Sequence, residues 1–95
     1  MEQIIEKFGK YIHNMHVNRW SMVYVDYVFK FENGYGALLV IEKFANLELY
    51  DVATIKFKDD YNFELVKVVP ETYIRAVMCR PVDEACEYLQ GIKDL

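Results

Sequence analysis

The segment that decides the fold is MVYVDYVFKFENGYGALLVIEKF, residues Met22–Phe44. Every second residue from Val23 to Phe31 is apolar, and the apolar run Ala37–Ile41 follows Asn33-Gly34. Asn-Gly between two apolar runs is the strongest short-range hairpin signal, because a type I′ turn needs a positive φ at both of its central residues. The segment therefore predicts two antiparallel strands that are joined at Asn33-Gly34.

The alternation of apolar and polar residues predicts further strands beyond this hairpin. We expect an antiparallel meander over the ranges Trp20–Glu32, Gly36–Phe44, Leu47–Lys58 and Phe63–Val69. The next stretch, Glu71–Arg80, fits either a buried strand or a short helix that Pro70 opens. We favour the strand for this stretch.

Two stretches at the ends of the chain have the apolar spacing of amphipathic helices. Glu2–Met15 places its apolar residues on one stripe. Pro81 suits the first position of a second helix, whose apolar stripe comprises Val82, Ala85, Cys86, Leu89 and Ile92. The expected fold is a single α+β domain over residues 1–95. It consists of an N-terminal helix, a four- or five-stranded antiparallel meander sheet and a C-terminal helix.

The composition argues against several functional classes. The 95 residues are 54% hydrophobic, which suffices for a packed core, and the formal net charge is −4. No cluster of lysine and arginine is present to bind phosphates, so we expect no direct contact with nucleic acid. The first residues are charged where a signal peptide would be apolar, and no window has the length of a membrane span. We expect a cytoplasmic protein with reduced cysteines and a protein partner.

One face of the predicted sheet is a candidate interaction surface. If both helices lie on the same face, the other face is exposed in a monomer. That face carries Met22, Tyr24, Val28, Tyr50 and Val52. Exposed apolar patches usually mark association surfaces, and tyrosine is common in interfaces. We therefore expect a homodimer or an obligate complex through this face, with its burial under loops or the last helix as the alternative.

Cysteine and histidine offer little chemistry in this sequence. His13 and His16 lie three residues apart in the predicted first helix, and Cys79 and Cys86 lie near the other end of the chain. The cysteine spacing is unlike that of zinc ligands, so we expect no metal, no disulfide, two surface histidines and two buried thiols. No motif around Ser21 or either cysteine resembles a catalytic nucleophile. We expect no catalytic residue and no cofactor.

Two groups of carboxylates deserve separate interpretation. Asp51 falls on the apolar face of its predicted strand, which indicates a buried carboxylate; the alternatives are a bulge or a strand end that lets it reach water, or a pairing with Arg19 or Arg75. The last helix begins with carboxylates that no cation offsets before Lys93. If the partner is basic, these carboxylates would steer its approach. The candidate steering residues are Asp83, Glu84 and Glu87, with Asp94 beyond them.

The order of elements, a helix followed by a meander, resembles the cystatin-type arrangement. Type III secretion chaperones are also small, acidic, dimeric α+β proteins. The profile is similar to phage-encoded inhibitors of host defence, including anti-CRISPR proteins, some of which present carboxylates where DNA phosphates would lie. We expect a non-catalytic protein-binding domain that inhibits or sequesters another macromolecule. The alternative is a small-molecule-binding or catalytic α+β domain with a pocket between the helices and the sheet.

Overall fold

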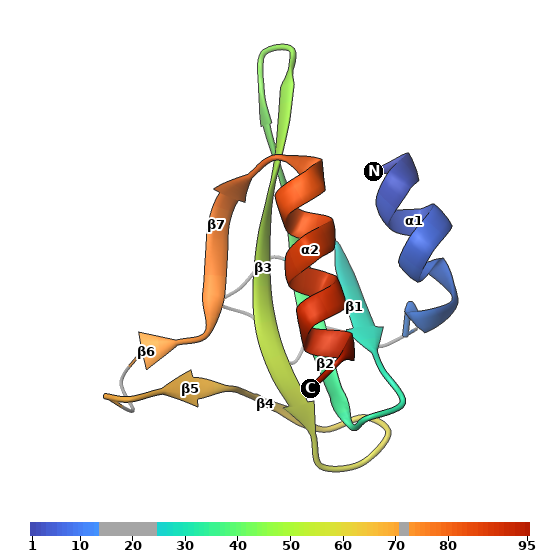
Figure 1. Ribbon diagram of the computed structural model, residues 1–95, viewed down its shortest axis with the longest axis vertical. Helices are drawn as coiled ribbons and strands as arrows, with labels where there is room; N and C mark the ends of the chain where they lie inside the picture. Colours follow the sequence, from blue (N-terminus) through green and yellow to red (C-terminus); the bar gives the residue numbers. More distant parts are fainter. Residues whose placement is uncertain (14–24, 71–72) are drawn as a thin grey trace.

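The computed structural model of the chain describes residues 1–13, 25–70 and 73–95. Along the chain, an N-terminal α-helix is followed by a set of antiparallel strands and then by a C-terminal α-helix. The predicted α+β fold is therefore confirmed (Figure 1). The helices are α1 (Glu2–Phe8), the short 3-10 helix η1 (Gly9–Tyr11) and α2 (Val82–Lys93). The strands are β1 (Tyr27–Lys30), β2 (Tyr35–Phe44), β3 (Leu47–Phe57), β4 (Phe63–Leu65), β5 (Lys67–Val68), β6 (Tyr73–Ile74) and β7 (Ala76–Arg80).

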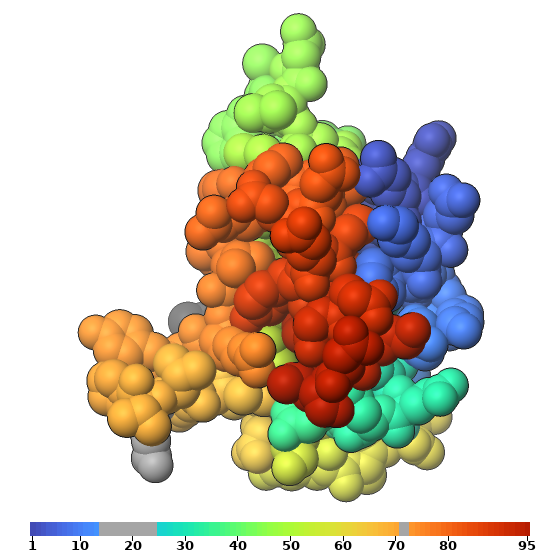
Figure 2. Space-filling model, viewed as in Figure 1, coloured from blue at the N-terminus to red at the C-terminus, as the bar shows by residue number. Residues whose placement is uncertain are grey.

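The main sheet has the order β1-β2-β3-β4, and β7 also pairs with β3. Strand β3 is long enough to hold two partners on one edge: β4 pairs with residues 55–57, and β7 pairs with residues 50–53. Between these two partners, β5 and β6 pair only with each other among the described residues. They form a hairpin that projects from the side of the body (Figures 1 and 2). We call this hairpin, residues 67–70 and 73–74, the arm.

The turn between β1 and β2 differs from the predicted one. Only Gly34 of the Asn33-Gly34 pair has a positive φ, 86°. The Phe31 N–H donates to the Tyr35 carbonyl at 2.8 Å, and the Gly34 N–H donates to the Phe31 carbonyl at 3.3 Å. These contacts define a three-residue loop, a type I turn followed by a left-handed glycine, so the predicted type I′ turn is wrong. Its register pairs Val28 with Leu38.

The first helix is shorter than predicted. Its α-helical part ends at Phe8, and Gly9–Tyr11 forms a 3-10 turn. After this turn Ile12 makes a bridge to Phe29, and the His13 N–H donates to the Val28 carbonyl at 2.8 Å. The chain leaves the helix because it pairs with the edge of β1. Tyr11 and Ile12 still pack on the core, which explains why the apolar spacing continued past the helix; Met15 lies outside the described residues.

The predicted strands agree with the structure in part. Part of the predicted Trp20–Glu32 strand lies outside the described residues, and the described part is β1. The predicted Phe63–Val69 strand is split into β4 and β5. In Glu71–Arg80 the described residues form β6 and β7, so the choice of strand over helix is confirmed for them.

Both helices cover one face of the sheet. The core on that face joins α1, through Ile4 and Phe8, to α2, through Leu89 and Ile92, with Leu39 of β2 beneath them. A second, smaller cluster on the opposite face consists of Val28, Ile55 and Phe63, with Val25, Leu38, Phe57 and Leu65 partly buried around it. The sheet is therefore buried on both faces over part of its length.

The predicted exposed face is wrong for the residues that the structure describes. Tyr50 and Val52 are each 1% exposed and lie in the core under the helices, and Val28 is 2% exposed in the opposite cluster. Met22 and Tyr24 lie outside the described residues. The cause is the register, because Val28, Leu38 and Ala53 are cross-strand partners and share the face away from the helices.

Candidate functional site

The arm carries the largest gathering of exposed apolar side chains in the described part of the chain. Val69 is 92% exposed and Tyr73 is 62% exposed, and Val68 and Ile74 are also exposed. Figure 2 shows this part of the chain standing clear of the helices. Soluble monomers rarely leave neighbouring apolar side chains in water, and such patches usually mark a binding surface.

Three backbone hydrogen bonds hold the base of the arm. The Thr54 N–H donates to the Arg75 carbonyl, the Val66 N–H donates to the Thr54 carbonyl, and the Arg75 N–H donates to the Val66 carbonyl, each at 2.9 Å. Val66 and Arg75 therefore leave the main sheet together at the middle of β3. This arrangement fixes the direction of the arm at its base while its apolar side chains stay in solvent.

The outer edge of β7 adjoins the arm. Within residues 1–13, 25–70 and 73–95, β7 pairs with β3 alone. Met78 on this strand is 64% exposed. Arg80 at its end lies 3.5 Å from Glu84 of α2, measured between Nη1 and Oε1. An exposed strand edge offers unpaired backbone groups to another chain.

The interior of this region contains the buried carboxylate that the sequence indicated. Asp51 is 8% exposed. A β-bulge shifts the register between β3 and β7 at this point, and Cys79 in the bulge has a φ of 53°. The Cys79 N–H donates to Asp51 Oδ1 at 2.7 Å. A bulge is present, as one of the sequence alternatives expected, but it supplies a backbone N–H to a buried Asp51 and does not let the carboxylate reach water; Arg19 lies outside the described residues.

Further acidic groups surround this bulge. A side-chain hydrogen bond with Asp51, together with desolvation and the charges of Asp51 and Asp26, raises the pKa of Glu42. Desolvation and the charge of Asp51 raise the pKa of the Cys79 thiol. This thiol therefore stays protonated near neutral pH and is a poor nucleophile. No group of three or more histidine, cysteine or acidic side chains in the described residues is arranged to hold a metal ion.

The cysteines and histidines do not form one site. Cys86 is buried in the helix-covered core as predicted, but Cys79 is exposed, because the bulge turns it away from the core. His13 lies after the first helix, with its Nε2 atom 2.6 Å from the Asp60 carbonyl oxygen and its ring edge-on to Phe57. His16 lies outside the described residues. The expected pair of histidines on one helix face is therefore wrong for His13.

The carboxylates at the start of α2 are exposed. Asp83, Glu84 and Glu87 all reach solvent, as does Asp94. The expectation that no cation offsets them before Lys93 is wrong, because Arg80 lies beside Glu84 one helical turn earlier. A cavity of about 460 Å³ between the helices is lined by Lys7, Phe8, Asp83, Cys86, Glu87 and Gln90.

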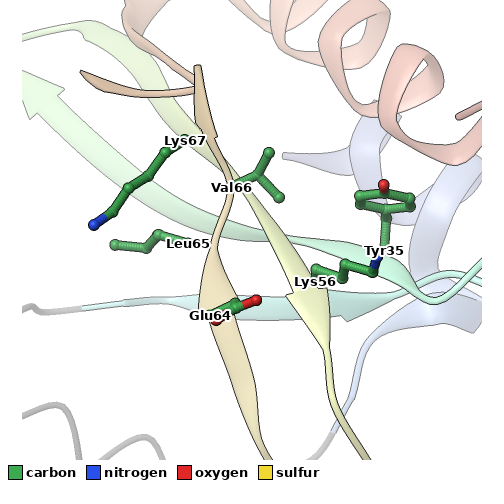
Figure 3. A pocket seen from close by; sticks show the side chains of 6 residues that line it. All are labelled: Tyr35, Lys56, Glu64, Leu65, Val66 and Lys67. Atoms are coloured by element: carbon green, nitrogen blue, oxygen red, sulfur yellow. The ribbon is translucent and has the colours of Figure 1, made fainter. Parts of the chain in front are cut away.

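A larger groove lies between the base of the arm and the sheet. Its volume is about 540 Å³, and it is lined by Tyr35, Lys56, Glu64, Leu65, Val66 and Lys67. Figure 3 shows Glu64 and Val66 on the side of the β4–β5 ribbon that faces Tyr35 and Lys56, with Leu65 and Lys67 on the other side. Lys56 Nζ lies 5.5 Å from the centre of the Tyr35 ring. Neither Asp51 nor His13 lines this groove, so the convergence expected of a catalytic pocket does not occur there.

Comparison with family models, with curated proteins and with solved structures finds no match to the chain. Among the described residues, no helix combines the length and the apolar character that crossing a membrane requires. The site is therefore argued from its own geometry. Sequence reasoning missed the arm, although one signal was present: apolar pairs on both sides of Pro70, Val68-Val69 and Tyr73-Ile74, in a segment with no polar alternation.

Proposed function

We propose that the chain is a non-catalytic protein-binding domain and that the arm is its principal binding surface. The observation that carries this proposal is the exposure of Val68, Val69, Tyr73 and Ile74 together on a hairpin held away from the body. Folding leaves these side chains in water, so binding a partner would remove apolar area that the fold alone does not bury. Tyr73 also supplies the amphipathic ring that interfaces favour.

The specific form of this function is a small acidic inhibitor or sequestering protein of the phage anti-defence type, which includes anti-CRISPR proteins. It would act in the cytoplasm on a protein partner and would not bind nucleic acid directly. The net charge of −4 and the exposed carboxylates of α2 support this form, because they disfavour binding to phosphates. A homodimer is the simplest complex that the arm could make, since its apolar side chains are self-compatible.

The chemistry of the described residues supports a non-catalytic role. The exposed Cys79 thiol has a raised pKa, and His13 lies beside Asp60 and Phe57 on another part of the molecule. A nucleophile needs a base within hydrogen-bond reach, and these two groups do not supply such a pair.

The test compares capture of a partner by the wild-type chain with capture by two variants. Val69→Ser, Tyr73→Ser and Ile74→Ser together remove three of the four exposed apolar side chains of the arm. Phe44→Ser and Leu47→Ser provide the matched control, because these residues are 51% and 56% exposed at the tip of the β2–β3 hairpin. We expect the wild type and the tip variant to retain the same partner and the arm variant to lose it. Equal capture by all three would contradict the proposal, and sedimentation of each form tests the homodimer.

The groove beside the arm supports the alternative, a small-molecule-binding domain. Tyr35 and Lys56 give it an aromatic ring and a cation, and its volume of about 540 Å³ suits a small ligand. Screening a metabolite library by thermal shift tests this alternative. A ligand whose stabilising effect disappears in Lys56→Ala but persists in Lys58→Ala would favour it over protein binding.

A further inference from the structure

The geometry points to a specific mode of recognition: the partner adds an extended segment to the outer edge of β7, with carboxylates on one face and apolar side chains on the other. This inference rests on the proposed protein-binding function and names the chemistry of the partner. Strand addition to an exposed sheet edge is a recurring way to bind a peptide, since main-chain hydrogen bonds give affinity and alternate side chains give specificity.

The backbone of β7 has an edge that can accept such a strand. The Arg75 carbonyl accepts from β3, and Val77 pairs with Val52 of β3. Because the backbone groups of successive residues in an antiparallel strand point to opposite edges, those of Ala76 and Met78 point outward. The outward groups lie on the edge that the described residues leave without a neighbouring strand.

The side chains of β7 differ between its two faces. Val77 packs against the helix-covered core, and Arg80 contacts Glu84 of α2, so both lie on the helix side. Arg75 is two residues before Val77 and lies on the same side by alternation. Two arginines therefore bracket a valine on the helix side of the edge.

The opposite face of β7 is apolar at its surface and acidic beneath. Ala76 and Met78 are exposed there. The carboxylates of Asp51 and Glu42 lie behind the bulge on that side. A partner carboxylate on this face would be repelled by Asp51 and Glu42, and the exposed Ala76 and Met78 favour an apolar side chain there. Carboxylates on the helix side would instead meet Arg75 and Arg80.

The charges of β7 decide between a second copy of the chain and another protein segment. If β7 paired with its own copy about a two-fold axis, the two strands would run antiparallel, so the Arg75 end of one chain would lie beside the Arg80 end of the other. Like charges placed directly opposite are destabilising. The arginines instead complement a segment that alternates acidic and apolar residues. The arm projects outward just before β7 begins and limits that end of the binding edge (Figure 1).

The experiment uses the full chain and short blocked peptides of alternating glutamate and valine, followed by amide NMR. We expect resonance shifts centred on residues 75–80. A peptide with lysine in place of glutamate should bind at least about tenfold more weakly, which corresponds to about 1.4 kcal/mol. A peptide whose valine or glutamate amides are N-methylated on the pairing edge should not bind. Equal binding of the glutamate and lysine peptides, or shifts confined to another part of the chain, would overturn the inference.

Protein variants test the same edge from the other side. Arg75→Gln with Arg80→Gln should weaken binding of the glutamate peptide about tenfold, as should Ala76→Pro, which removes an outward N–H at an edge position that tolerates proline. Lys43→Gln with Lys58→Gln changes the net charge equally and should leave binding unchanged. The N-methylated peptide keeps the test decisive if Ala76→Pro fails to fold.

A substitution at Glu84 should strengthen binding of the glutamate peptide, whereas the β7 variants weaken it. Glu84 pairs with Arg80 in the free protein, so Glu84→Gln should release Arg80 and tighten binding of the glutamate peptide. With the captured partner, loss of binding in the arm variant but not in the β7 variants would overturn the inference and leave the proposed function standing. Full binding by both the arm and the β7 variants would overturn both.

Discussion

The helix-covered face and the arm are built from the same kinds of residues, yet one is closed and the other is open. Leu39, Leu89 and Ile92 are fully buried between the sheet and α2, whereas Val69 and Tyr73 of the arm are mostly exposed. The difference is one of placement. The helices cross the face formed by β1, β2 and β3, whereas the arm leaves the sheet at the edge of β3, where Val66 and Arg75 bind Thr54. The fold therefore depends on the first region, and we propose that binding depends on the second.

Truncation of one apolar residue in each region gives the largest contrast. Leu89→Ala should lower the free energy of unfolding by about 3 kcal/mol, because it removes buried atoms and leaves a cavity in the core. Val69→Ala should change it by less than about 0.5 kcal/mol, because the side chain is already in water. Urea titration of both variants measures the difference. Similar losses of stability would show that the arm is part of the folding core.

The turn at Asn33 connects the sheet to the helix-covered side. The Asn33 Nδ2 group donates to the carbonyls of Ile92 and Lys93 at 2.9 Å, and to that of Leu95 at 3.2 Å. They lie at the end of α2 and just beyond it, where no further turn of helix supplies N–H donors, although the Ile92 carbonyl also accepts from the Leu95 N–H at 3.2 Å. Asn33→Ala should therefore cost about 1 kcal/mol of unfolding free energy, near the net value of an ordinary hydrogen bond. Amide exchange at the end of α2 measures the effect. It should be unchanged in the comparison variant Asn62→Ala, on the far loop, and faster exchange at the end of α2 in that variant would contradict a capping role specific to Asn33.

The charged groups around the sheet should have opposite effects on stability as the pH changes. The Lys30 ammonium lowers the pKa of Asp60 through a hydrogen bond and its charge. A carboxyl whose folded-state pKa is lowered contributes stability above its unfolded pKa and loses it as the pH falls through the folded one. Glu42 is the reverse case, since its raised pKa favours the folded state at low pH and disfavours it at neutral pH.

Two substitutions measure these opposite signs. At pH 7, Glu42→Gln should raise the melting temperature and Asp60→Asn should lower it. Both differences should shrink as the pH falls toward 3. Glu42 becomes protonated in both the folded and the unfolded state, whereas Asp60 loses its contribution progressively as the pH falls below its unfolded pKa toward its lowered folded-state pKa. Thermal melts between pH 3 and pH 7 check this. A melting temperature that falls in Glu42→Gln at pH 7 would show that the repulsion near Asp51 is absent.

The fold class was predictable from the sequence, because it depends on local patterns. Which residues share a face of the sheet was not predictable, because this depends on the geometry of one turn. A two-residue loop at Asn33-Gly34 would pair Val28 with Leu39, whose partner on β3 is Val52. The three-residue loop pairs Val28 with Leu38 instead. A shift of one residue moves a side chain to the other face of a sheet. This shift explains why Val28 and Val52 lie on opposite faces of the sheet.

The break in the strand from which the arm begins was unpredictable for a related reason. The residues from Phe63 to Val69 read as one strand, and nothing local marks a break at Val66. The break arises from hydrogen bonds with Thr54 and Arg75, which come from distant parts of the sequence. By contrast, the start of α2 and the burial of Asp51 followed from Pro81 and from the position of a carboxylate in an apolar pattern. Features that depend on neighbouring residues could be predicted from the sequence, whereas hydrogen bonds between distant segments could not.

The acidic start of α2 should affect association far more than stability. If the captured partner is basic, Glu84→Gln with Glu87→Gln should slow its association and reduce the salt dependence of the rate, with little change in melting temperature, because both side chains are exposed. Stopped-flow or surface binding kinetics at several salt concentrations measure this. An unchanged association rate with a basic partner would show that these carboxylates form a solvated face of the helix and do not steer the partner.

The most direct test of the central claim is the affinity of the captured partner for the arm variant that combines Val69→Ser, Tyr73→Ser and Ile74→Ser. The account predicts at least about a tenfold loss of affinity, equivalent to about 1.4 kcal/mol, with a melting temperature close to that of the wild type. The tip variant with Phe44→Ser and Leu47→Ser should bind as the wild type does. An arm variant that folds normally and binds the partner with unchanged affinity would contradict the claim that the arm is the binding surface.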